Sequence, residues 1–255
     1  MLRFELSRKE IRVFYGIIIS FNLLFMIMNS PFLVSQLREG GVQSASILDF
    51  VKYQFDLKRE GVFAAWYSGT LLFITGLIAT LISRVAPSVE KHRALHRAGW
   101  TAMALLFFAL SADEVSQIHE QSQALYHMIN PHSTVKLYAG DWIPVLMPLI
   151  AIITVGLILF AALVLSANRL SLVLAAVAIT CWIGAIFAET FEAGLAPGSM
   201  SKAMEGLIEE SLEIVGTTLF CASFLEFLKK QQTTPEPVPG KLSKKARKEA
   251  AARGA

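Results

Sequence analysis

The sequence predicts an all-α polytopic membrane protein, namely a bundle of six transmembrane helices with both termini in the cytoplasm. Of its 255 residues, 54% are hydrophobic and only 17% are charged, and the mean hydropathy is +0.53. These values exceed what a soluble domain of this length needs to fill a core. Six apolar stretches are also long enough to cross a hydrocarbon layer about 30 Å thick, which takes about 20 helical residues.

The apolar stretches are expected to form one transmembrane domain over residues 1–230. The expected spans lie near 11–30, 62–83, 98–119, 143–166, 170–191 and 204–228. Helices are expected because runs such as LIAIITVGLILFAALVL lack the polar and apolar alternation of a membrane barrel. The first span is expected to be an uncleaved anchor, since the MNSPFLVSQ that follows has no small-x-small cleavage pattern.

The distribution of Lys and Arg predicts the orientation of this bundle. With the N-terminus in the cytoplasm, 17 of the 23 Lys and Arg residues fall on the cytoplasmic side. Positively charged loops are retained on that side during insertion. We therefore expect a multi-pass protein of the bacterial inner membrane with both termini inside.

Two segments outside the spans differ from them in composition. Residues 43–59 place apolar side chains at helical spacing, which predicts a short interfacial helix on the outer surface. Residues 231–255 combine a proline-rich linker with a basic run, so we expect a disordered cytoplasmic tail. Because no aromatic platform accompanies this charge, nucleic acid is not an expected partner, whereas the lipid bilayer is.

Charged residues of three predicted spans gather near one end of the bundle. Span three carries them in FALSADEVSQIHEQSQALYH, residues 108–127, while span five ends in acids and span six begins with them. Because an ionised carboxylate facing acyl chains costs several kcal/mol, we expect an acidic cup that opens to the extracytoplasmic side. Its expected members are Asp113, Glu114, Glu120, Glu189, Glu192, Glu205, Glu209, Glu210, Glu213, His119 and His127.

Helical phase assigns these residues to particular faces. If the helix of span three continues to His127, its polar residues fall within about 120° of one another, at about 100° per residue. Those residues are Asp113, Ser116, Gln117, Glu120, Gln123 and His127. On span six, Glu205, Glu209 and Glu213 share a stripe of about 80°. Both stripes are expected to point into the bundle.

A cup of this kind requires compensating positive charge, because carboxylates crowded into a poorly hydrated recess must take up protons or bind cations. We expect a divalent metal, Zn, Fe or Mn, since carboxylates with one or two imidazoles suit these ions. The predicted ligands are Asp113, His119, Glu120, Glu189, Glu209 and Glu213. His119 and Glu120 are the predicted catalytic residues, with Glu120 or a span-six glutamate as the base. Such a site would suit a hydrolase or an oxidase acting on a lipid or small amphipathic substrate from the outer leaflet or the periplasm.

Two other functions stay open at this point. Proton uptake by the same acids would suit a proton- or cation-coupled transporter, although the sequence has no inverted repeat and no matching pair of broken helices. A non-catalytic assembly or sensor protein would instead use the acids to bind a partner. The paired Glu-x-x-His motif of di-iron bundles is absent, because Ser116 and Ala124 stand three residues before His119 and His127.

Two stretches resemble known families. LSADEVSQIHE, residues 110–120, together with EESLEIVG, residues 209–216, resembles a recurring pattern in bacterial polytopic membrane proteins of unassigned function. Ser111, Asp113 and His119 are also similar to the alkaline ceramidase and adiponectin-receptor superfamily, whose members place Ser, Asp and His around zinc to hydrolyse lipid amides. That similarity implies a zinc hydrolase. The chain departs from it in having glutamates where the superfamily has a closing H-x-x-x-H, and six spans instead of seven.

Overall fold

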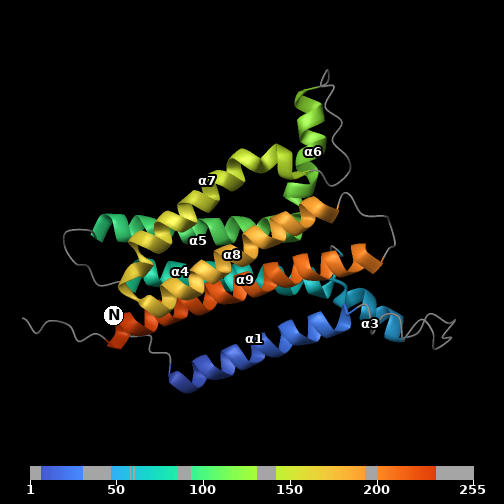
Figure 1. The fold of residues 1–255 in the computed structure, drawn as a ribbon. Coiled ribbons are helices and arrows are strands. Elements are labelled where there is room, and N and C mark those ends of the chain that lie inside the picture. Colours follow the sequence, from blue (N-terminus) through green and yellow to red (C-terminus); the bar gives the residue numbers. More distant parts are fainter. Residues whose placement is uncertain are drawn as a thin grey trace, which may run out of the picture.

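The computed structural model describes residues 7–30, 47–57, 59, 61–85, 93–130, 142–192 and 200–233, and the regular elements in these ranges are all helices (Figure 1). In chain order they are α1 (Arg8–Met28), α3 (Ile47–Phe55), α4 (Phe63–Val85), α5 (Arg93–Ser116), α6 (Ile118–Ile129), α7 (Trp142–Leu163), the short 3-10 helix η2 (Leu165–Ala167), α8 (Arg169–Glu192) and α9 (Met200–Thr233). Six of them, α1, α4, α5, α7, α8 and α9, are long and apolar enough to cross a membrane. The predicted all-helical class and six apolar spans are therefore confirmed, whereas the side of the membrane that holds each terminus stays a prediction.

Helix α1 begins at a capping box that its sequence encodes. The Ser7 hydroxyl accepts a hydrogen bond from the Glu10 backbone N–H at 3.2 Å, and the Glu10 carboxylate accepts one from the Ser7 N–H at 2.7 Å. These bonds satisfy N–H groups that a helix start leaves without intrahelical partners. The capping box therefore stabilises the first turn of α1, which precedes the apolar residues of the first span.

Helix α9 is the central helix of the bundle. It packs against α1, α4 and α8, while α5 packs on α4 and α7 packs on α8. An aromatic core joins α5, α7 and α9, since the Trp100 ring centroid lies 4.9 Å from those of Phe160, Phe224 and Phe227. Trp100 and Phe224 are fully buried. Packing of this kind stabilises helix association in lipid, where removal of apolar surface from water contributes little.

Glycines allow the closest approaches between helices. A Cβ atom at Gly216 of α9 would lie 2.5 Å from Trp182 Cδ1 and 3.2 Å from the Ala178 carbonyl oxygen, both on α8. A Cβ atom at Gly76 of α4 would lie 2.8 Å from the Phe108 ring of α5. Small residues at such positions bring helix backbones together and increase their van der Waals contact.

A hydrogen-bonded network ties α1 to the rest of the bundle. The Asn22 side-chain amide donates to Thr218 Oγ1 of α9 at 2.8 Å, and the Tyr67 hydroxyl of α4 donates to Asn22 Oδ1 at 2.6 Å. Asn22 is 6% exposed, so leaving its amide unpaired would cost about 1–3 kcal/mol. The network thus connects α1, α4 and α9 at a depth where water is scarce.

Helix α3 is held in place by two amide side chains. Asn29, which follows α1, donates to the Phe55 carbonyl at 2.7 Å and accepts from the Leu57 N–H at 3.1 Å. Gln54 of α3 accepts from the Phe63 N–H at 3.2 Å, at the start of α4. The helix predicted within 43–59 is therefore observed over Ile47–Phe55, while residues 43–46 lie outside the described ranges. Its location at the membrane surface stays a prediction.

We expect Gly216→Ala to destabilise the protein by about 1–3 kcal/mol, because its methyl group would force α8 and α9 apart at Trp182. The matched control is Gly156→Ala on α7, where nothing lies within 4 Å of the added Cβ and helix propensity improves by about 1 kcal/mol. Thermal unfolding of both variants in detergent micelles measures the difference. Equal effects of the two substitutions would contradict the close contact at Gly216.

Candidate functional site

The helix termini of the bundle bring the predicted acidic segments to one end. Helices α5 and α8 finish there, α9 starts there, and α6 projects outward from it beside the start of α7 (Figure 1). We call this region the α6 end. It contains the last turn of α5 with Asp113, the first turn of α6 with His119, and the last turn of α8 with Glu189.

A break in the helix separates α5 from α6. Gln117 has φ 56° and ψ 37°, a left-handed conformation that costs a non-glycine residue about 1–2 kcal/mol. Its N–H completes the last turn of α5 by donating to the Asp113 carbonyl at 2.7 Å, and its carbonyl starts α6 by accepting from the Gln121 N–H at 3.2 Å. The condition on which the polar face of span three was assigned, a single helix to His127, is therefore not met, because the left-handed residue redirects the chain after Ser116.

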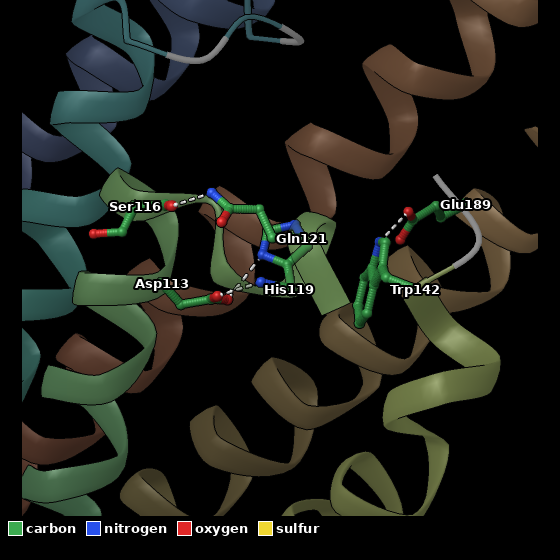
Figure 2. Close-up of polar contacts among 6 residues, drawn as sticks. All are labelled: Asp113, Ser116, His119, Gln121, Trp142 and Glu189. Atoms are coloured by element: carbon green, nitrogen blue, oxygen red, sulfur yellow. Dashed lines mark hydrogen bonds and ion pairs between the residues drawn. The ribbon is translucent and has the colours of Figure 1, made fainter. Parts of the chain in front are cut away.

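The Asp113 carboxylate holds α6 across this break. Oδ1 accepts a hydrogen bond from the His119 backbone N–H at 2.8 Å, and Oδ2 lies 2.9 Å from His119 Nδ1 (Figure 2). Hydrogen bonds to charged groups contribute about 1.5–3 kcal/mol each, which offsets the cost of the left-handed Gln117. Asp113 thus replaces the N-cap side chain that Gln117 does not provide.

The same contact assigns roles to the two imidazole nitrogens. An ionised carboxylate is only an acceptor, so Nδ1 must carry the proton that it donates to Asp113. The side chains of Asp113 and His119 are 26% and 24% exposed, which places the pair at the boundary between the bundle and its surroundings. When the imidazole is neutral, this contact therefore favours the tautomer with its proton on Nδ1, which leaves Nε2 as the nitrogen without a proton.

Trp142 connects this pair to α8. Its ring lies 4.8 Å from the His119 ring, centroid to centroid, in an edge-on arrangement. Its indole N–H donates to Glu189 Oε1 at 2.5 Å, so the indole stands between His119 and Glu189 (Figure 2). Residues of α5, α6, α7 and α8 are thereby joined in one polar cluster, which we define as Asp113, His119, Trp142 and Glu189.

The other predicted ligands, the glutamates of α6 and α9, do not belong to the polar cluster defined above. Glu209 and Glu213 are half-buried on α9, about 14 and 20 Å from the start of that helix at 1.5 Å per residue. The carboxylate oxygens of Glu205 are buried. Glu120 lies in α6, but its side chain falls outside what the structure describes, as does that of Glu192 in α8.

Within the described ranges, no group of three or more His, Cys, Asp and Glu residues is close enough to hold a metal ion. The structure does bring together Asp113, His119 and Glu189 of the predicted set, with Trp142 between His119 and Glu189. The six-residue metal site as a whole stays a prediction.

Trp142 and Gln117 were not predicted as parts of the site. Trp residues are common at the membrane–water interface, so the position of Trp142 beside the outer end of an expected span could have indicated that it lies near the site. Gln117 gave no comparable signal, because left-handed conformations are enriched in Gly, Asn and Asp rather than in Gln.

Fold and site together define a class, that of multi-pass helical membrane proteins with a carboxylate and histidine pair at one end of the bundle. The chain belongs to the family described as Domain of unknown function (DUF8692), whose model matches residues 18–227. This range includes every residue of the polar cluster and every predicted metal ligand. No curated protein and no solved structure matches the chain.

We expect Gln117→Gly to stabilise the protein by about 0.5–1 kcal/mol, because glycine adopts the left-handed conformation without the steric cost that glutamine bears. The matched control is Ala124→Gly, an exposed position inside α6 where glycine should destabilise by about 1 kcal/mol. Thermal unfolding in detergent measures both variants. Destabilisation by Gln117→Gly as large as that of the control would contradict the break at Gln117.

Proposed function

We propose that the chain is a membrane enzyme, a hydrolase or an oxidase, whose chemistry takes place at the α6 end of the bundle. The observation that carries this proposal is the two-point contact between the Asp113 carboxylate and His119. A histidine whose Nδ1 is held by a carboxylate recurs both in general bases and in metal-bound histidines, with Nε2 as the reactive nitrogen. The arrangement therefore supports a chemical role for His119 and an orienting role for Asp113.

We further propose a divalent metal, Zn, Fe or Mn, as the cofactor at this end. Nε2 of His119 and the carboxylates of Glu120, Glu189, Glu209 and Glu213 form the proposed ligand set, and its support is that Trp142 links His119 to Glu189. A bound zinc would lower the pKa of water to about 7, while iron or manganese would supply redox chemistry. Asp113, placed behind His119, would then increase the basicity of the ligand rather than bind the metal itself.

The proposed substrate is a lipid or a small amphipathic molecule that arrives from the outer leaflet or the periplasm. Its support is the location of the polar cluster at the end of six apolar helices, together with the excess of Lys and Arg toward the other end. On this proposal the protein belongs to a bacterial inner membrane, the termini are cytoplasmic, and the α6 end faces outward.

A proton- or cation-coupled transporter is the second candidate. The buried carboxylate oxygens of Glu205 favour it, because buried acids within transmembrane helices are typical of proton and ion pathways. The packing in the opposite half of the bundle favours the enzyme instead. Trp100, Phe224 and Ile82 are fully buried there in an apolar core. A transporter would need a polar route through that core.

Elemental analysis of protein purified at neutral pH without chelators tests the enzyme proposal. We expect about one or two metal ions per chain in the wild type and a loss of that metal in His119→Ala and Glu213→Ala. The matched control is Glu226→Ala, which removes a carboxylate near the other end of α9, where it pairs with Lys229. Absence of stoichiometric metal from the wild-type protein would contradict the metal-dependent enzyme.

A further inference from the structure

Helix α6 leaves the bundle instead of joining it. Its axis points away from the six long helices at a steep angle to them, and it packs on the first turns of α7 (Figure 1). It follows the candidate span of α5, which ends at Ser116, after a single residue. Its direction is therefore that of a helix along a membrane surface rather than that of a spanning helix.

One side of α6 is apolar and exposed. At about 100° per residue, Ile118, Leu125, Met128 and Ile129 fall within about 100° of one another around the helix. Their side chains are 59%, 55%, 77% and 67% exposed, respectively. We call these four residues the apolar flank.

The remaining sides of α6 have different surroundings. Ser122 is buried and His119 and Tyr126 are half-buried, so the side that carries them faces the protein. His127 is exposed, and its position lies about 160–180° from Ile118 and Leu125 by helical phase. Helix α6 therefore has one side against the protein, an apolar flank, and a polar flank opposite to it, as interfacial helices have.

An exposed apolar residue also stands at the end of the span that precedes the apolar flank. Val115, in the last turn of α5, is 63% exposed within a candidate membrane span and stands three residues before Ile118. On the same flank, the Gln121 side chain turns back to donate to the Ser116 carbonyl at 3.3 Å. This bond pairs the amide N–H of the exposed Gln121 and satisfies a carbonyl at the end of α5.

We propose that α6 is an amphipathic helix that lies in the head-group region of the bilayer, with the apolar flank against the acyl chains and His127 toward water. The occupant of the flank is phospholipid, because the flank is exposed and apolar and begins two residues after the candidate membrane span of α5 ends. This position holds His119 at the level of the lipid head groups. This position of α6 depends neither on a bound metal nor on enzymatic activity.

Site-directed spin labelling of the full chain in phosphatidylcholine and phosphatidylglycerol vesicles tests this proposal. The background is Cys181→Ala, since Cys221 is fully buried and does not react. Single cysteines replace Leu125 and Ile129 on the apolar flank and His127 on the polar flank. Val155→Cys on α7, 56% exposed in the middle of a candidate span, is the reference for contact with lipid. Unchanged thermal unfolding shows that each variant is folded.

The readout is the accessibility of each label to oxygen relative to a water-soluble nickel chelate. We expect a severalfold higher ratio at Leu125 and Ile129 than at His127 and a lower ratio than at Val155, because oxygen concentrates in the hydrocarbon and becomes scarcer toward the head groups, where α6 would lie. Nickel accessibility at Leu125 and Ile129 equal to that at His127 would place α6 in water and overturn the proposal. Exclusion of both reagents from the apolar flank would also overturn it, since a protein partner or a second copy would then cover the flank.

Discussion

Hydrocarbon offers no hydrogen-bond partners, and this constraint governs the whole chain. Backbone groups of a membrane-spanning helix are satisfied within the helix, and several polar side chains inside this bundle bond neighbouring helices. Asn22 bonds Thr218 and Tyr67, while the Ser111 hydroxyl donates to the Gly69 carbonyl at 2.7 Å. Where α5 breaks at Gln117, the carboxylate of Asp113 supplies the acceptor that the helix no longer provides.

The candidate site is a consequence of that break. A continuous helix would have carried His119 and the residues after it farther from the bundle along the axis of α5. Because the chain turns at Gln117, His119 instead lies beside Asp113 and against Trp142, which reaches Glu189 on α8. The hydrogen bonds that stabilise the turn are thus the same ones that orient the histidine, so structure and proposed chemistry depend on one carboxylate.

The sequence predicted much of the fold because composition determines it. Spans of about 20 apolar residues have few alternatives to crossing a bilayer, so their number and order follow from hydropathy. The break after α5 was not predicted, because Gln117 has no local preference for the left-handed conformation, which tertiary contacts of Asp113 stabilise. The pairing of Asp113 with His119 likewise depends on that turn and could not be obtained from helical phase. Trp142 was not recognised because its partners, His119 and Glu189, lie 23 and 47 residues away.

The central claim is that the Asp113 carboxylate holds His119 in one tautomer across the break between α5 and α6. The most direct test is ¹⁵N NMR of the imidazole nitrogens in histidine-labelled protein, with the His119 signals assigned by their loss in His119→Asn. At a pH where this imidazole is neutral, we predict a protonated Nδ1 in the wild type and a mixture of tautomers in Asp113→Ala. A wild-type His119 protonated at Nε2, or one unaffected by loss of the Asp113 carboxylate, would contradict the account.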